Sequence, residues 1–130
     1  MAAIYLDSSA LVKLAVREPE TEALRKHLRR RNHWVSSALA RTEVMRALLP
    51  CGADAMTAGR GVLARCDLVR INDRILNLAG TLLPPELRSL DAIHLATAER
   101  LRDDISELLT YDDRMADAAR VLGHRVTAPA

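Results

Sequence analysis

Short apolar runs alternate with helical stretches along the whole chain, and this alternation restricts the folds that the chain can adopt. The runs that favour strands lie at 4–6, 34–35, 68–71 and 108–111, with a further edge strand at 125–127. The stretches that favour helices lie at about 9–16, 19–31, 38–48, 54–65, 73–81, 90–101 and 114–122. Strands that alternate with helices favour a mainly parallel sheet with helices on both faces. We therefore expect an α/β fold.

The length of the chain, 130 residues, favours one domain spanning residues 1–130. Hydrophobic residues make up 49% of it, and because Phe is absent, Leu, Ala, Val and Ile must fill most of the core. Cys51 and Cys66 are isolated and form no disulfide framework, which is typical of a reducing compartment. No apolar run reaches the roughly 18 residues of a membrane span. We expect a cytoplasmic protein that does not bind a membrane.

An acidic residue follows the first strand directly. Asp7 comes after the apolar run 4–6 and before the helical stretch that Ser8 or Ser9 can cap. The C-terminal end of a strand is where open α/β sheets bind their ligands. A buried carboxylate needs a cation or hydrogen-bond donors to compensate it. Taken alone, Asp7 is equally well explained as part of the helix cap.

Three further acids, Glu43, Asp91 and Asp112, lie within or beside apolar sequence. Each one has a purely structural explanation. Asp91 complements the dipole of the helix that begins near it, and Asp112 can cap the helix that follows it. Glu43 can pair with Arg41 or Arg46 on the surface of its helix. For any single acid the structural explanation is the better one.

The four acids together indicate more than each one alone. Asp7 and Asp112 end strands of one parallel sheet, so both lie at the same edge, and helices that begin at this edge bring Asp91 and Glu43 close. Four carboxylates in one cleft repel each other unless a cation is present. A hard divalent ion such as Mg²⁺ or Mn²⁺ removes this penalty, because it prefers oxygen ligands. Two such ions would lie ~3.5–4 Å apart.

The acids stand in four sequence blocks: Ile-Tyr-Leu-Asp-Ser-Ser-Ala-Leu-Val-Lys-Leu at 4–14, Ser-Ala-Leu-Ala-Arg-Thr-Glu-Val at 37–44, Leu-Arg-Ser-Leu-Asp-Ala-Ile-His-Leu-Ala at 87–96 and Leu-Thr-Tyr-Asp-Asp-Arg-Met at 109–115. In this order the blocks resemble the motifs of PIN-domain ribonucleases, and most of all the VapC toxins of type II toxin–antitoxin pairs. The resemblance covers nearly the whole chain. It implies a three-layer α/β/α sandwich, cleavage of RNA that depends on Mg²⁺ or Mn²⁺, a homodimer, and inhibition by a cognate VapB antitoxin.

The resemblance also assigns residues. The positions of the family's acidic quartet, which is catalytic and binds the metal, are taken by Asp7, Glu43, Asp91 and Asp112. Ser9 and Thr110 fall on hydroxyl positions near the first and the last acid. Because Asp113 follows Asp112 directly, the resemblance leaves open which of the two carboxylates faces the metal. Strand register favours Asp112, with Asp113 as a residue that supports the ligands without binding the metal.

Basic and histidine residues near the acids are weaker candidates. His94 lies three residues after Asp91, on a similar helix face, and a supporting or core role suits it better than metal ligation. Arg114 is a candidate for RNA contact; Lys13 is a lesser one, since its stem can instead cover apolar surface. Of the 19 basic residues 17 are Arg, which suits phosphate but can also follow from genomic composition.

We hypothesise a toxin that acts as a Mg²⁺-dependent endoribonuclease, with tRNA or rRNA as candidate targets and with 5′-phosphate and 3′-hydroxyl products. One alternative enzyme is a phosphotransfer protein with Asp7 as nucleophile, although such phosphatases carry a second acid where this chain has Ser9. The other alternative is a non-catalytic PIN-like binding module, whose acidic cleft docks an Arg-rich segment of a partner.

Overall fold

The fold is built on one parallel sheet. The computed structural model describes residues 2–130. The strands are β1 (Ala3–Leu6), β2 (Trp34–Ser37), β3 (Cys66–Val69), β4 (Ile105–Leu109) and β5 (Val126–Thr127). They lie in the order β3-β2-β1-β4-β5, and every neighbouring pair is parallel. The predicted parallel sheet is confirmed, and its first strand lies at its centre.

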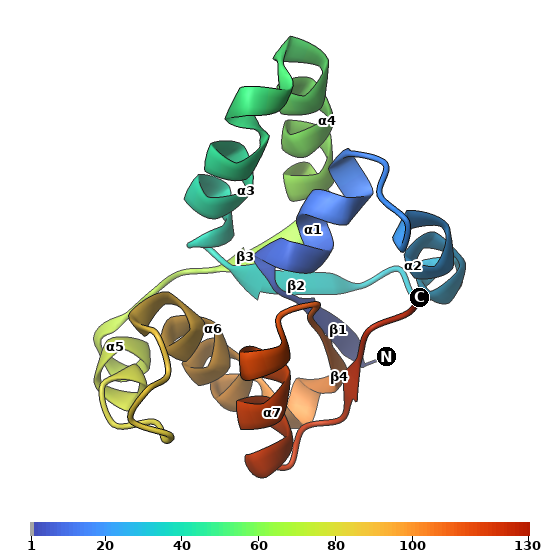
Figure 1. Ribbon diagram of the computed structural model, residues 1–130. Helices are drawn as coiled ribbons and strands as arrows, with labels where there is room; N and C mark the ends of the chain where they lie inside the picture. The colour runs from blue at the N-terminus through green and yellow to red at the C-terminus, as the bar shows by residue number, and fades with distance from the viewer. Residues whose placement is uncertain (1) are drawn as a thin grey trace.

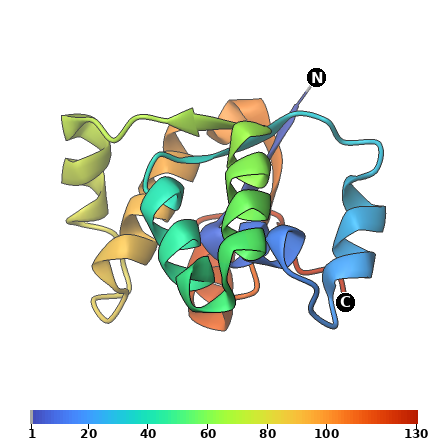
Figure 2. The same ribbon diagram turned by 90° about the horizontal axis from the view of Figure 1, so that it is seen from above.

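Seven α-helices connect the strands. They are α1 (Ser8–Ala15), α2 (Thr21–Leu28), α3 (Ala40–Leu48), α4 (Ala53–Ala64), α5 (Asp73–Ala79), α6 (Ser89–Arg100) and α7 (Asp113–Val121). Figure 1 shows α1, α3 and α4 on one side of the sheet and α5, α6 and α7 on the other. Seen from above, α1, α3 and α4 lie side by side on their face (Figure 2). The predicted three-layer α/β/α sandwich is therefore confirmed.

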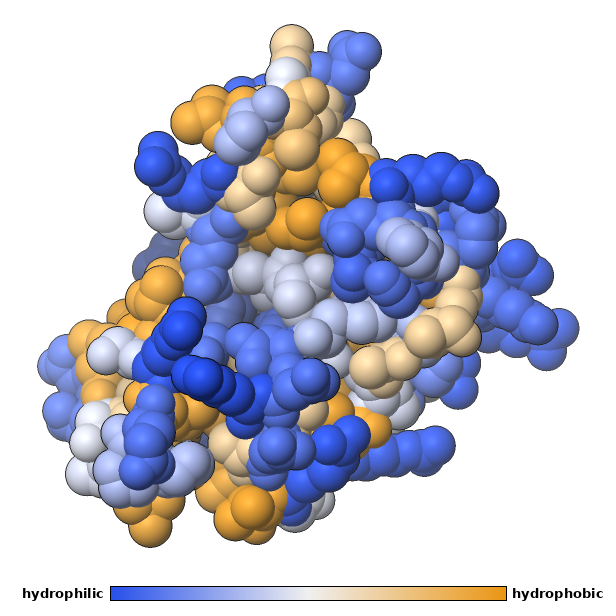
Figure 3. Space-filling model, in the orientation of Figure 1, coloured by the Kyte–Doolittle hydropathy of each residue, from blue (hydrophilic) through white to orange (hydrophobic). Residues whose placement is uncertain are grey.

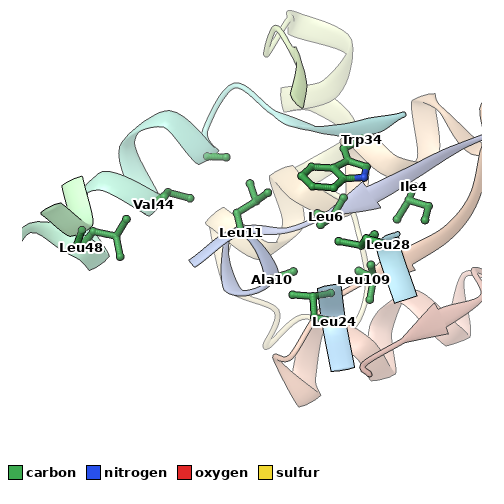
Figure 4. Packing of buried hydrophobic residues seen from close by; sticks show 12 residues of the cluster. Ile4, Leu6, Ala10, Leu11, Leu24, Leu28, Trp34, Val44, Leu48 and Leu109 are labelled. Atoms are coloured by element: carbon green, nitrogen blue, oxygen red, sulfur yellow. The ribbon is translucent and has the colours of Figure 1, made fainter. Parts of the chain in front are cut away.

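The two faces of the sheet bury two separate cores, because successive side chains of a strand point to opposite faces. Ile4 and Leu6 of β1 belong to the core under α1 to α4, whereas Ala3 and Tyr5 belong to the core under α6 and α7. Figure 4 shows the first core, in which Trp34 is surrounded by aliphatic side chains. As expected from the composition, aliphatic residues fill most of both cores.

Three predicted elements differ most in their limits. The third strand begins and ends two residues earlier than predicted, because Trp34 to Ser37 of β2 pair with Cys66 to Val69. The fourth strand spans 105–109 instead of 108–111, so Asp112 lies three residues beyond its end and does not follow it directly. Helix α2 is shorter at both ends. It begins at Thr21, whose hydroxyl accepts a hydrogen bond from the Glu18 backbone N–H, and the run of three arginines at 29–31 lies in the turn after it.

The register of the central strands sets the position of the acids. Leu6 of β1 lies opposite Leu109 of β4, so both strands end side by side. Asp7 follows the first of these ends, and Thr110 follows the second. No helix within residues 2–130 is long and apolar enough to cross a membrane.

Candidate active site

Asp7 lies at the centre of the acidic edge and is 4% exposed. Its Oδ1 accepts hydrogen bonds from the Ser9 hydroxyl (2.6 Å) and from the Ala10 backbone N–H (3.1 Å). Its Oδ2 accepts a hydrogen bond from the Thr110 hydroxyl at 2.5 Å. Asp7 itself, rather than Ser8 or Ser9, is thus the N-cap of α1. The two predicted hydroxyl positions both contact this carboxylate.

The burial of Asp7 changes its protonation. Burial raises the pKa of Asp7, and the hydrogen bonds from Ser9 and Thr110 lower it only in part. Without a nearby cation, the ionised form of Asp7 is therefore less favoured than in a solvent-exposed aspartate. Capping alone would not need so deep a position, because a cap residue at a helix end is normally at the surface.

Glu43 on α3 reaches toward the start of α1 and toward α6. Its Oε1 accepts a hydrogen bond from the Ser8 hydroxyl at 2.6 Å and lies 2.6 Å from His94 Nε2. Partial burial would raise the pKa of Glu43, but the hydrogen bonds from His94 and Ser8 outweigh it and lower the pKa overall. The structure thus pairs Glu43 with His94 and not with Arg41 or Arg46.

Asp91 and Asp112 complete the acidic edge. Burial raises the pKa of Asp91, and the nearby charges of Asp112, Asp7 and Glu43 raise it further, against an opposing effect of His94. These charges affect Asp91 because the fold brings all four segments together. Figure 3 shows hydrophilic residues across the middle of the molecule, between apolar surfaces above and below.

Asp112 is half-buried and is the N-cap of α7. Its Oδ1 accepts the backbone N–H groups of Arg114 (2.9 Å) and Met115 (3.2 Å), which leaves Oδ2 for another ligand. Asp113 is exposed in the first turn of α7. The charge of Asp112, and not that of Asp113, is among those that raise the pKa of Asp91. The geometry therefore favours Asp112 as the acid that faces the other three.

The donor chemistry of this edge fits a hard divalent cation, since carboxylate and hydroxyl oxygens predominate. Within residues 2–130, however, no three Asp, Glu, His or Cys side chains are disposed as a ready-made metal site. Glu43 Oε1 is hydrogen-bonded to His94, and Asp112 Oδ1 caps α7. Mg²⁺ fits such an arrangement, because it commonly binds through one or two carboxylates and retains several waters.

The two basic candidates differ in their surroundings. Arg114 is exposed beside the acids. The Lys13 ammonium lies 3.1 Å from Glu18 Oε2 and 3.2 Å from Glu20 Oε1, and it lies 4.8 Å from the centre of the Tyr111 ring. Because these groups already compensate its charge, the structure does not favour Lys13 as an RNA contact.

The sequence interpretation missed three polar residues that the structure makes important. Ser8 binds Glu43, and Tyr5 binds His94 through its hydroxyl. Glu107 of β4 is buried and hydrogen-bonded to His27 of α2 and to Thr127 of β5. Glu107 gave no signal in the sequence, because the predicted strand at 108–111 began one residue after it.

Comparison with known proteins agrees with this fold. Residues 4–121 match the family model described as the PIN domain. The chain is 67% identical over 129 residues to "Ribonuclease VapC46" of Mycobacterium tuberculosis, with 99% of both chains covered. It is 42% identical over 130 residues to "Ribonuclease VapC35" of the same species, which covers 97% of this chain and 96% of that one. The chain therefore belongs to the PIN-domain family, among its VapC ribonucleases.

Solved structures share the fold at low sequence identity. The crystal structure of M. tuberculosis VapC20, a sarcin–ricin loop cleaving toxin, superposes with a TM-score of 0.74 at 16% identity and covers 97% of this chain and 99% of that one. A toxin–antitoxin complex from Klebsiella pneumoniae also gives a TM-score of 0.74, at 24% identity and with 98% of each chain covered.

Proposed function

We propose that this protein is the toxin of a type II toxin–antitoxin pair and that it hydrolyses RNA phosphodiester bonds with the help of divalent metal ions. The observation that carries the proposal is the buried Asp7 at the C-terminal end of the central strand, coupled electrostatically to Asp91. The identity to relatives named ribonucleases supports the same activity.

Asp7, Glu43, Asp91 and Asp112 would hold Mg²⁺ or Mn²⁺ at this edge. A bound ion of this kind would supply a nucleophilic water at neutral pH and stabilise negative charge at phosphorus. Ser9 and Thr110 hold the Asp7 carboxylate in a fixed orientation through both of its oxygens. Asp113 would support these ligands without binding the ion itself. Arg114 would bind the RNA backbone, since its guanidinium suits phosphate.

We assign three kinds of partner to this protein. The substrate is RNA, with tRNA and rRNA as the candidate classes; rRNA is supported by the fold shared with VapC20, a toxin that cleaves the sarcin–ricin loop. A cognate VapB-type antitoxin would inhibit the activity, which is supported by the fold shared with the toxin of a toxin–antitoxin complex. The active form is a homodimer of this one domain, and it acts in the cytoplasm, where these RNAs lie.

Cleavage of RNA tests the proposal directly. The purified protein and its Asp7→Asn variant are incubated with total RNA in Mg²⁺ or in EDTA, and the RNA ends are mapped. We expect cuts with 5′-phosphate and 3′-hydroxyl ends that occur only for the wild type in Mg²⁺. Unchanged cleavage in EDTA and by the variant would refute the proposal.

A non-catalytic binding module is the second candidate. The observation that favours it is that no three acidic, His or Cys side chains of residues 2–130 are preset for a metal ion. In that case the acidic edge docks an Arg-rich segment of a partner. Calorimetry distinguishes the two: tight binding of the antitoxin without measurable binding of Mn²⁺ would favour the module.

A further inference from the structure

Tyr5, His94 and Glu43 form a continuous series of hydrogen-bonded side chains. The Tyr5 hydroxyl lies 2.7 Å from His94 Nδ1, and His94 Nε2 lies 2.6 Å from Glu43 Oε1. Tyr5 is 0% exposed and His94 is 2% exposed, and their rings meet edge to face with centroids 5.9 Å apart. These hydrogen bonds thus connect β1, α6 and α3, and water does not reach the two members Tyr5 and His94.

The direction of each hydrogen bond follows from the donors present. The Tyr5 hydroxyl can donate to His94 Nδ1, 2.7 Å away. With Nδ1 accepting this hydrogen bond, Nε2 is the ring nitrogen that carries a proton, and it donates to Glu43 Oε1. Both ring nitrogens are occupied, which excludes His94 as a metal ligand in this arrangement.

The two donors to Glu43 bind the same oxygen. Ser8 and His94 both bind Oε1, and Oε2 accepts no hydrogen bond from residues 2–130. The glutamate is therefore held from its buried side, with one oxygen available to a ligand at the acidic edge. A packing role alone would not require a histidine here, because an apolar side chain of similar size would fill the same space.

We infer that Tyr5 and His94 are positioning residues, which hold Glu43 so that Oε2 is presented to a divalent cation. This inference rests on the proposed function, since it gives Glu43 a role in binding the cation. Histidine and carboxylate ligands of metals are commonly oriented by such outer hydrogen bonds, and loss of one weakens metal affinity about 10–100-fold. Ser8, which is half-buried, is the third residue that holds Glu43.

Two substitutions of His94 separate positioning from packing. His94→Asn keeps a polar group near Nδ1 but loses the bond to Glu43, whereas His94→Gln places an amide N–H near Nε2 and restores it. Binding of Mn²⁺ to the full chain is measured by calorimetry without RNA, and thermal unfolding checks that each variant is folded. We expect His94→Asn to bind Mn²⁺ about 10–100-fold more weakly than the wild type, and His94→Gln to recover most of the loss.

Two results would overturn the inference: wild-type affinity in His94→Asn, or equal losses in His94→Asn and His94→Gln. If His94→Asn does not fold, the variant Tyr5→Phe tests the inference instead, because it removes only the hydrogen bond to His94 Nδ1. Weakened binding of Mn²⁺ by Tyr5→Phe supports the inference, and wild-type affinity overturns it.

The variant Glu43→Gln separates this inference from the proposed function. If Glu43→Gln binds Mn²⁺ like the wild type, the role of Glu43 in the proposed function fails, and the inference fails with it. If Glu43→Gln binds weakly while His94→Asn binds normally, only the inference fails.

Discussion

Thr110 donates its hydroxyl to Asp7 Oδ2 at 2.5 Å, a contact between residues that lie 103 positions apart. The same hydroxyl oxygen accepts the backbone N–H of Asp112 at 3.1 Å. One side chain therefore fixes the Asp7 carboxylate and also the segment that carries Asp112. Thr110 thus links the two acids directly, although Asp7 and Asp112 follow different strands.

Replacement of this hydroxyl is expected to destabilise the protein. Thr110→Val keeps the shape of the side chain but leaves a buried carboxylate with one donor fewer, which costs about 1–3 kcal/mol. Thr110→Ser keeps the donor and is the matched control, with a smaller effect. Urea denaturation at neutral pH measures both variants. Equal stability of Thr110→Val and the wild type would show that the Thr110–Asp7 bond contributes nothing.

The pH dependence of stability follows from the buried Asp7. Burial raises the pKa of Asp7 in the folded state above its value in the unfolded chain, so the folded state binds this proton more tightly. The contribution of Asp7 to stability is therefore favourable below the usual aspartate range and decreases as the pH rises through the raised pKa. Above that pKa the folded protein carries the full penalty of a buried charge.

The variant Asp7→Asn tests this predicted direction of the pH dependence. Asn is as good an N-cap as Asp, and it carries no charge, so the metal-free variant should unfold at a higher temperature than the wild type at neutral pH. The difference should shrink as the pH falls. Mn²⁺ should stabilise the wild type and not the variant. Asp117→Asn is the control, since the Asp117 side chain is 80% exposed on α7. A variant less stable than the wild type in EDTA at neutral pH would contradict the prediction.

Two glycines of α4 provide a matched pair for helix packing. A Cβ added at Gly61 meets nothing within 4 Å, so Gly61→Ala should stabilise the protein by about 0.5–1 kcal/mol through helix propensity. A Cβ at Gly59 would overlap Leu48 Cδ1 and lie 3.4 Å from Met45 Sδ, both on α3. Because Leu48 is fully buried, Gly59→Ala should destabilise the protein by about 1–3 kcal/mol. Chemical denaturation of the two variants gives the comparison, and an equal gain for both would refute close packing of α3 on α4.

The proposed role of Arg114 predicts a change in the salt dependence of RNA binding. Arg114→Ala should weaken binding about equally for different RNA sequences and reduce the slope of log affinity against log salt by about 1. Arg120→Ala, an exposed residue at the other end of α7, should leave the slope unchanged. Fluorescence anisotropy over a range of salt concentrations measures both slopes in an inactive background. Equal slopes for the two variants would remove Arg114 from the RNA-binding surface.

The order of strands and helices could be predicted because apolar periodicity records which face of an element is buried. The position of Asp7 could be predicted for the same reason, since it follows a buried strand directly. The partner of each side chain could not be predicted. Glu43 turns to His94 rather than to an arginine on its own helix, and Lys13 turns to Glu18 and Glu20. These choices depend on which segments meet in space.

The start of β3 also could not be predicted from its own residues. Cys66 and Asp67 look like the end of a helix by composition, and only pairing with β2 makes them part of a strand. Glu107 was missed because the predicted strand at 108–111 began after it, whereas β4 begins at Ile105. Its buried carboxylate is satisfied by His27 and Thr127 from distant segments.

The central strand β1 comes first among the strands along the chain, and its neighbour β4 comes fourth. A ribosome must therefore pass residue 110 before Asp7 can meet the hydroxyl that holds it. A nascent chain that ends before β4 lacks the strands on one side of β1, so it cannot hold Asp7 in this way. The acidic edge of this fold therefore forms only after both strands that flank it have been synthesised.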